Sequence, residues 1–179
     1  MSVNLPEIGL GCRDYQLAVY IANRPALKAF EELNQLRPLL AGELANVVSA
    51  TGNHWRKIFN LYAKLAHQLS PQQFDSWQDY RDQQLLKAQS REALLFSQPD
   101  LSRSDCVHIV SGKGYGEILC QGLPLLAVDP DFQICESRRL IVSPYFDYRQ
   151  LSNLKLERLC QLVTGLMDHS QLKTSASSR

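Results

Sequence analysis

The sequence lacks a long apolar segment and a targeting signal. No stretch approaches the roughly 18 consecutive apolar residues that a bilayer crossing requires, and the first residues have neither the basic nor the apolar region of a secretory signal. We therefore expect a cytoplasmic protein that is not inserted in a membrane. The formal net charge is only +1, so the molecule as a whole has no large field to attract nucleic acid or anionic lipid.

Metal-binding and disulfide patterns are also missing. The five cysteines contain no C-x-x-C pair, and no other cluster of His, Cys, Asp and Glu has metal-ligand spacing. We predict no metal site, and the sequence identifies no cofactor. Cys106, Cys120 and Cys160 lie in apolar segments and are interpreted as buried free thiols. His108 lies inside a strand-like apolar segment and is interpreted as a core histidine rather than a metal ligand.

Length and composition limit the architecture. A chain of 179 residues has the size of a single domain, and such a chain buries about 70% of the surface that its unfolded form exposes. The hydrophobic content of 45% and the charged content of 21% are ordinary for a folded globular protein. No internal repeat or low-complexity linker divides the chain. We predict one α/β domain over residues 1–169 and a flexible polar tail over residues 170–179.

Apolar segments of strand length alternate with segments of helical spacing. The expected strands are residues 17–22, 93–96, 107–110, 125–128 and 140–142. The expected helices are residues 25–37, 43–50, 54–69, 74–90, 112–121 and 153–167. Continuous apolarity is typical of strands that are covered on both faces. We therefore predict a three-layer α/β sandwich with a mainly parallel sheet of four to five strands. The alternative is an α+β arrangement, with a helical amino-terminal half beside a small sheet.

Polar turns follow these strands. In a parallel sheet, the turns that leave the carboxyl ends share one rim, which is where ligands bind in open α/β folds. Asn23 and Arg24 follow the first strand, so Arg24 is expected to project at the same rim as Lys113. The alternative is that Arg24 pairs with a structural carboxylate.

A glycine-rich turn over residues 111–117 follows the third expected strand and opens a helix. Ser111, Lys113 and the backbone amides of this turn could hold an anion at the positive end of the helix. The spacing matches neither the phosphate-binding G-x-x-x-x-G-K-[ST] loop nor the dinucleotide-binding G-x-G-x-x-G fingerprint. The alternative is a flexible turn without a ligand.

Residues 51–57 place a histidine, an indole and two cations within one helical turn. His54 is a candidate for proton transfer, and Asn53 and Arg56 are candidates for ligand binding, with Arg56 and Lys57 able to hold phosphate. Adjacent helical side chains point about 100 degrees apart, so these groups cannot all converge on one ligand. In the alternative interpretation, Trp55 packs in the core, the cations are solvated, and His54 caps the helix or makes a structural hydrogen bond.

The last polar segment, residues 143–153, follows the final strand and is rich in aromatic residues. Ser143, Tyr145 and Arg149 are candidate ligand-binding residues, and Asp147 is a second candidate for proton transfer. Asp147 and Arg149 could instead pair across a tight turn.

Two resemblances rest on these segments. Residues 18–25, 52–57, 107–113 and 143–150 together resemble a family of small proteobacterial proteins of unknown function, over most of the chain. That resemblance implies a bacterial source and no activity.

The second resemblance is to the uracil-DNA glycosylase superfamily, in which a strand also leads into a loop with a Ser-Pro element and a final helix. Val142, Ser143 and Pro144, with the helix expected from Asn153, are similar to that arrangement. It implies a related fold. Members of that superfamily carry His-Pro-Ser near the last strand and an acidic or amide water-positioning loop after the first. Here Val142 precedes Ser143, and residues 22–25 contain no acid, so base excision is not implied.

These observations lead to two hypotheses. In the first, the protein binds a phosphate-bearing small molecule or nucleic-acid fragment at the carboxyl rim, where Arg24, Lys113 and Arg149 hold the anion. In the second, it is a non-catalytic interaction module that contacts another protein through residues 145–148 or the helix around Trp77. The sequence does not decide whether the protein is an enzyme or what its oligomeric state is.

Overall fold

Strands and helices cover most of residues 5–176, which the computed structural model describes, with side chains described as far as Asp168. The strands are β1 (Gly9–Gly11), β2 (Leu17–Tyr20), β3 (Leu36–Arg37), β4 (Glu92–Leu95), β5 (Val107–Ser111), β6 (Leu126–Ala127), β7 (Gln133–Cys135) and β8 (Leu140–Ser143). The helices are α1 (Lys28–Glu31), α2 (Glu43–Thr51), α3 (Asn53–Leu69), α4 (Trp77–Gln83), α5 (Lys113–Leu119) and α6 (Asn153–Ala176), with a 3-10 turn at Glu136–Arg138.

Within the described residues, the strands form one mixed eight-stranded sheet in the order β3-β1-β4-β2-β5-β8-β7-β6. The four central strands β4, β2, β5 and β8 are parallel to one another, whereas β1, β7 and β6 each run antiparallel to a neighbour. The predicted α/β class is confirmed, but the prediction of a mainly parallel sheet of four to five strands is wrong. The strands that it missed, β1, β3 and β7, have two or three residues each, too few for an apolar pattern.

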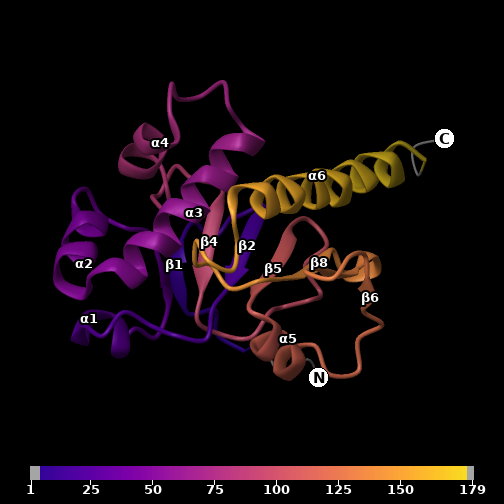
Figure 1. Ribbon diagram of the computed structural model, residues 1–179, viewed down its shortest axis with the longest axis horizontal. Helices are drawn as coiled ribbons and strands as arrows, with labels where there is room; N and C mark the ends of the chain where they lie inside the picture. Colours follow the sequence, from indigo (N-terminus) through magenta and orange to yellow (C-terminus); the bar gives the residue numbers. More distant parts are fainter. Residues whose placement is uncertain (1–4, 177–179) are drawn as a thin grey trace.

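The two faces of the sheet bury different side chains because successive residues of a strand point to opposite sides. Along β2 and the residue that follows it, Leu17, Val19 and Ile21 belong to one buried cluster, and Ala18 and Tyr20 belong to the other. Helices α3 and α6 cover the first face, and α5 lies on the second (Figure 1). The continuous apolarity of these strands therefore arises, as expected, from cover on both sides.

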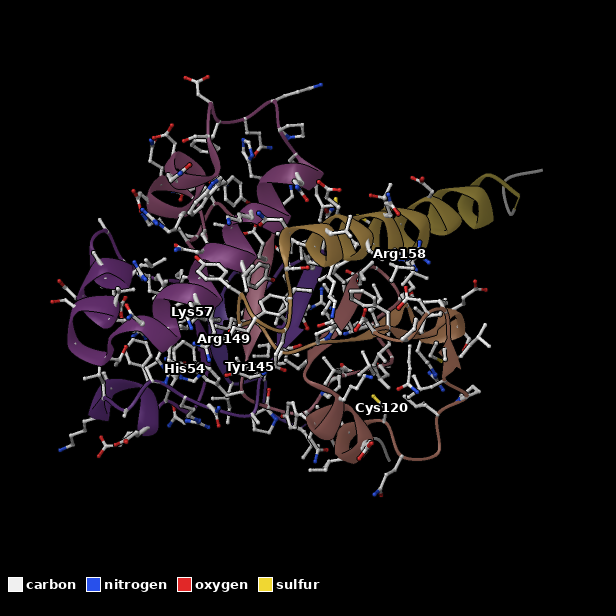
Figure 2. The ribbon with its side chains drawn as sticks, in the orientation of Figure 1. His54, Lys57, Cys120, Tyr145, Arg149 and Arg158 are labelled. Atoms are coloured by element: carbon white, nitrogen blue, oxygen red, sulfur yellow. The ribbon has the colours of Figure 1, made fainter. Side chains whose placement is uncertain are left out.

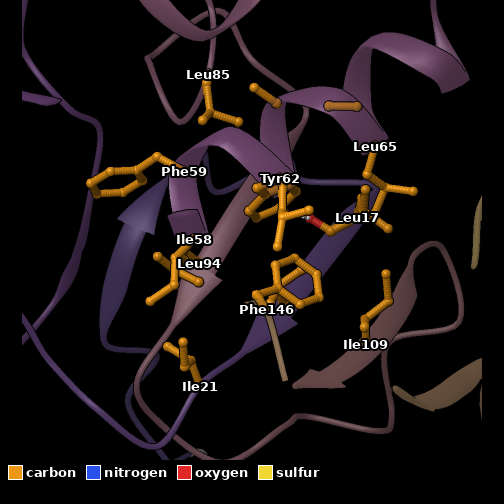
Figure 3. Packing of buried hydrophobic residues seen from close by; sticks show 14 of the residues in the cluster. Leu17, Ile21, Ile58, Phe59, Tyr62, Leu65, Leu85, Leu94, Ile109 and Phe146 are labelled. Atoms are coloured by element: carbon orange, nitrogen blue, oxygen red, sulfur yellow. Dashed lines mark hydrogen bonds between the residues drawn. The ribbon is translucent and has the colours of Figure 1, made fainter. Parts of the chain in front are cut away.

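Helix α3 supplies much of the first cluster. Its buried side chains include Ile58, Phe59, Tyr62 and Leu65, which recur at helical spacing and pack over the central strands (Figure 3). The Tyr62 hydroxyl is buried and donates toward the main-chain oxygens of Leu17, at 3.1 Å, and Ala93, at 2.9 Å. One phenol thus ties α3 to both β2 and β4.

Several helices differ in length from the prediction. The predicted helix 25–37 is helical only at Lys28–Glu31, and the predicted helix 74–90 only at Trp77–Gln83. The last helix is longer than expected: the predicted tail is helical as far as Ala176, and residues 177–179 lie outside the described residues. Among residues 5–176, no helix has both the length and the apolar content that a bilayer crossing requires.

Strand order determines where a ligand site can form. β4 and β5 flank β2 on opposite sides. The connection that leaves β2 leads to β4 on one side of it, and the connection that leaves β5 leads to β8 on the other side. The connection from β2 to β4 runs through α1, α2, α3 and α4, whereas the one from β5 to β8 contains α5 on the other face. Such a reversal of strand order opens a crevice at the carboxyl ends of the strands. The turns after β2, β5 and β8 border this rim.

Candidate functional site

The rim of the sheet brings together His54 at the start of α3 and Tyr145 after β8. The His54 Nε2 atom lies 2.7 Å from the Tyr145 hydroxyl, and the two rings stack with centroids 5.8 Å apart. Asn23, after β2, donates from Nδ2 to the same hydroxyl at 3.4 Å. Gly52 turns the chain into α3 with φ of +88°, a conformation that side chains disfavour. Three segments that are far apart in the sequence therefore meet at one phenol.

An ion pair beside this group holds the turn after β8. Lys57 Nζ lies 3.0 Å from Asp147 Oδ2, and the backbone amide of Arg149 donates to Asp147 Oδ1 at 2.9 Å. The backbone hydrogen bond from Arg149, followed by the hydrogen bond from Lys57, lowers the pKa of Asp147. Both ion-pair partners are only partly buried, so the pair is worth about 1 kcal/mol or less. Figure 2 shows His54, Lys57, Tyr145 and Arg149 grouped on this part of the molecule.

Two serines predicted as ligand-binding residues are buried and bonded within the protein. Ser111 Oγ accepts the backbone amide of Phe146 at 3.1 Å, and the Ser143 hydroxyl donates to the oxygen of Pro144 at 2.9 Å. Phe146 is fully buried and meets the Tyr62 ring edge to face. These contacts give the serines a role in shaping the turn, and the turn presents Tyr145 at the rim.

The side chains of Arg24 and Lys113 do not point to a shared anion site. Arg24 Nη1 donates to the main-chain oxygens of Phe30, Glu31 and Leu33 at 3.0, 3.2 and 2.9 Å, which caps the end of α1. Lys113 Nζ donates to the oxygen of Pro130 at 2.9 Å, in the connection between β6 and β7. The partners of both cations are thus backbone carbonyls and not the structural carboxylate considered for Arg24.

An open depression of about 600 Å³ lies beside the His54 and Tyr145 pair. Its lining comes from the turn after β2 and from the junction of α2 and α3: Ala22, Asn23, Arg24, Ala26, Ala50, Thr51, His54 and Trp55. Trp55 is only 3% exposed and packs on Phe59 and Phe96, so its indole belongs to the core. Asn53, Arg56 and Arg149 are exposed. The guanidinium groups of Arg56 and Arg149 form no hydrogen bond with any other described residue.

Sequence reasoning missed an extension of this surface along α3. Lys64 Nζ lies 5.1 Å from the Trp77 ring centroid and 5.2 Å from that of Tyr148. Asn60 donates to the Tyr148 hydroxyl at 2.9 Å. The sequence did contain one sign of this extension, because His54, Lys57 and Lys64 share one face of a helix. Their partners after β8 and in α4 were not visible in the sequence.

The interior histidine and cysteines agree with their interpretation as core residues. His108 is fully buried, with Nδ1 2.7 Å from the Tyr20 hydroxyl and Nε2 3.2 Å from the main-chain oxygen of Arg103. Burial lowers its pKa, so the imidazole is held in its neutral form. Cys106 and Cys120 are buried free thiols and Cys160 is partly buried. Among the described residues, no three His, Cys, Asp or Glu side chains are grouped so as to hold a metal ion.

Comparison with known proteins places the chain in a family. Residues 8–164 match the family of unknown function DUF6942. The chain belongs to this family. The match includes the turns that carry Asn23, His54 and Tyr145, and it confirms the predicted membership of a family without a known activity.

The other comparisons found no relatives. No curated protein and no solved structure matches the chain. The bacterial source, the cytoplasmic location and the similarity to the uracil-DNA glycosylase superfamily therefore stay predictions.

Proposed function

We propose that this protein binds a phosphate-bearing ligand, a nucleotide or a nucleic-acid fragment, at the carboxyl rim of its sheet. One observation carries the proposal: His54 and Tyr145 meet at the rim, next to the open depression and to the cations of α3 and of the turn after β8. A phosphate needs cationic and hydroxyl donors, and a base or sugar needs a hollow with aromatic walls.

The cation set differs from the one that the sequence favoured. Arg24 and Lys113 already donate to backbone carbonyls, whereas the guanidinium groups of Arg56 and Arg149 are exposed and have no hydrogen-bond partner among the described residues. Lys57 is partly neutralised by Asp147. These contacts support Arg149, on the turn that carries Tyr145, as the main phosphate-binding residue, because a free guanidinium offers two parallel donors to a phosphate. Arg56 lies two residues from His54 and points to another side of α3, so it is the secondary candidate.

Roles in proton transfer follow from the same contacts. Asp147 is ionised and bound to Lys57, which supports a part in holding the turn more than a part in moving a proton. His54 has a ring nitrogen on the Tyr145 hydroxyl, so a proton taken up or released by the imidazole could pass to or from that hydroxyl. If the protein has an activity, His54 is the residue that we propose to carry it.

Ligand binding is tested by thermal shift and by calorimetry with inorganic phosphate, a nucleoside monophosphate and a short single-stranded oligonucleotide. A ligand at about 100 times its Kd stabilises the folded chain by about 2.7 kcal/mol. We expect a saturable response that is lost in the Arg56→Ala, Arg149→Ala double variant and that weakens with added salt.

The control variant, Arg13→Ala and Arg138→Ala, removes the same number of positive charges at the opposite end of the strands, before β2 and β8. It should bind the probes as the unmodified protein does. An Arg24→Ala, Lys113→Ala double variant decides between the two cation sets. If none of the three probes binds to the unmodified protein, the proposal fails.

A second candidate, the protein interaction module, is favoured by the surface around Lys64. The two aromatic segments expected to contact a partner, one at Trp77 and one at Tyr148, lie on either side of this lysine. Tyr148 is 37% exposed. A stoichiometric partner that copurifies with the protein and is lost in a Trp77→Ala, Tyr148→Ala variant would support this function over ligand binding.

A further inference from the structure

The contact between His54 and Tyr145 has the geometry of a hydroxyl beside a general base. Asn23 donates from Nδ2 to the Tyr145 hydroxyl at 3.4 Å, so the phenolic oxygen is the acceptor of that bond. The phenolic hydrogen is then directed to His54 Nε2, 2.7 Å away, which serves as the acceptor nitrogen of a neutral imidazole. A hydroxyl that donates to an imidazole at this distance is the arrangement of an activated nucleophile.

The phenol needs this base in order to react. Partial burial raises the pKa of Tyr145, against the lowering effect of the hydrogen bond from Asn23, and the charge of Asp147 raises it further. The hydroxyl therefore keeps its proton at neutral pH, and it becomes a strong nucleophile only when His54 takes this proton during the attack. Asn23 then donates to the oxygen on which negative charge develops.

Both rings are held in place from inside the protein and are open to solvent. The ring of the buried Trp55 lies with its centroid 5.7 Å from that of His54. The Tyr145 ring packs against the turn after β5, where a Cβ added to Gly112 would lie 3.5 Å from Tyr145 Cδ2. His54 is exposed and lines the open depression, so a substrate in that depression can reach the pair.

The charges near the pair favour a phosphodiester over a phosphomonoester. Lys57 is already paired with Asp147, whereas the guanidinium of Arg149 is exposed and has no hydrogen-bond partner among the described residues (Figure 2). A diester carries one negative charge on each phosphate, and a monoester carries about 1.5 to 2 at neutral pH. The second charge of a monoester would be repelled by Asp147, two residues from Tyr145. A depression of about 600 Å³ has room for a sugar and a base.

We propose that Tyr145 is the nucleophile of a phosphodiester cleavage at the proposed phosphate site, on which this activity depends. Tyr145 Oη attacks the phosphorus while His54 Nε2 takes the phenolic proton. The bond between Oη and phosphorus forms, the bond from phosphorus to the leaving oxygen breaks, and a tyrosyl phosphodiester and an alcohol result. His54 lies on the attacking side, so the leaving oxygen takes its proton from water.

Water completes the cycle. It attacks the phosphorus of the tyrosyl phosphodiester, the bond to Tyr145 Oη breaks, and His54 returns its proton to the phenol. The proton that the attacking water loses replaces the one that the first leaving oxygen took from solvent. The net reaction turns a phosphodiester and water into a phosphomonoester and an alcohol.

The leaving group decides which step is slow. A phenol has a pKa of about 10 and water one of about 15.7, so a phenolate leaves more readily than the alkoxide of a sugar. With a sugar as leaving group, the tyrosyl phosphodiester is therefore broken down faster than it forms. An aryl leaving group, which departs without a proton, should make the first step fast enough for the intermediate to accumulate.

The probe is thymidine 5′-(p-nitrophenyl phosphate), a phosphodiester with a coloured aryl leaving group. Mixing it with the unmodified protein should release p-nitrophenol in an initial burst about equal to the protein concentration. Mass spectrometry of the acid-quenched protein should find a thymidylyl group on the peptide that contains Tyr145. The monoester p-nitrophenyl phosphate should react more slowly.

Three variants separate the roles of the side chains. Tyr145→Phe should abolish the burst and the adduct, and His54→Ala should slow the burst about 10²–10⁴-fold. Added imidazole should restore part of that loss, because a free base can occupy the exposed position of His54. Tyr148→Phe is the matched control. Its phenol belongs to the same turn but accepts a hydrogen bond from Asn60, so the variant should react as the unmodified protein does.

Circular dichroism shows whether each variant is folded, and calorimetry with inorganic phosphate shows whether the rim still binds an anion. Tyr145→Phe should bind phosphate, since Arg149 is unchanged. The activity is overturned if the unmodified protein binds phosphate but gives neither burst nor adduct, or if folded Tyr145→Phe still releases p-nitrophenol. Both results leave the phosphate site standing. Failure of every phosphate-bearing probe to bind would remove the site and the activity together.

Discussion

Relative to a Glu92→Gln variant, the unmodified protein should lose stability as the pH rises from the acid side through neutrality. Burial raises the pKa of Glu92 from 4.5 to about 8. Between these two values the folded chain keeps a proton that the unfolded chain has released. The contribution of Glu92 to the free energy of unfolding therefore decreases with rising pH across this window. Glutamine has nearly the same shape and does not titrate, so the variant lacks this contribution.

The size of the effect follows from the width of the window. One proton of difference changes the free energy of unfolding by about 1.4 kcal/mol for each pH unit. From about pH 5.5 to pH 7.5, Glu92 is mostly protonated in the folded chain, falling to about three quarters at pH 7.5, and mostly ionised in the unfolded chain. The unmodified protein should lose about 2.5 kcal/mol relative to Glu92→Gln over these two units. This comparison cancels any constant difference between the two proteins.

Urea unfolding at a series of pH values, followed by circular dichroism and without added ligand, measures this quantity. Glu117→Gln is the matched control, since the same substitution on the surface should leave the pH dependence of stability unchanged. Parallel curves for the unmodified protein and Glu92→Gln would show that Glu92 is ionised at little cost in the folded chain. The reasoning from its burial would then be refuted.

Three further substitutions, one of them with a matched control, test the packing and the rim. Tyr62→Phe should lower the free energy of unfolding by about 1–2 kcal/mol, because the buried phenol ties α3 to β2 and β4; an unchanged urea midpoint would contradict this. Gly116→Ala should cost about 1–3 kcal/mol, since its Cβ would lie 2.5 Å from Val142 Cγ1, whereas Gly114→Ala in the same helix meets no atom within 4 Å and should be neutral or stabilising. Arg24→Ala should lower the thermal midpoint by an amount equivalent to about 1–2 kcal/mol, as three carbonyls at the end of α1 lose their donor; full stability would argue against this capping role.

Arg24 and Lys113 illustrate why the sequence predicted the rim but not its cations. The pattern predicted a helix over residues 25–37, so no free carbonyls were expected near Arg24. Helix α1 ends at Glu31 instead, and the carbonyls around its end accept the guanidinium. Lys113 reaches Pro130 across a connection whose course depends on the pairing of β6 with β7 and of β7 with β8. Both outcomes depend on contacts that local patterns do not contain.

His54 and Tyr145 show the opposite case. Each was a candidate because of its own segment. The turn that carries Tyr145 follows a strand and was expected at the rim, whereas α3, which carries His54, follows α2 and is brought there by the fold. Their contact is separated by 91 residues of chain. The ion pair of Lys57 with Asp147 also joins two segments that are distant in the sequence, where the alternative drawn from the sequence was a pair between Asp147 and Arg149. The sequence does not single out Glu92, because a single acid at the start of an apolar segment is typical of an ordinary strand boundary.

The sequence by itself determined the α/β class, the four central strands and the amphipathic face of α3, because these depend on the spacing of apolar residues along short segments. Only the tertiary structure decided the edge strands, the partners of each cation and the burial of Glu92. Edge strands of two or three residues form by backbone pairing with distant segments, and a charged side chain takes whichever partner the folded backbone brings within reach. The chemistry at either end of the sheet is therefore a property of the assembled fold.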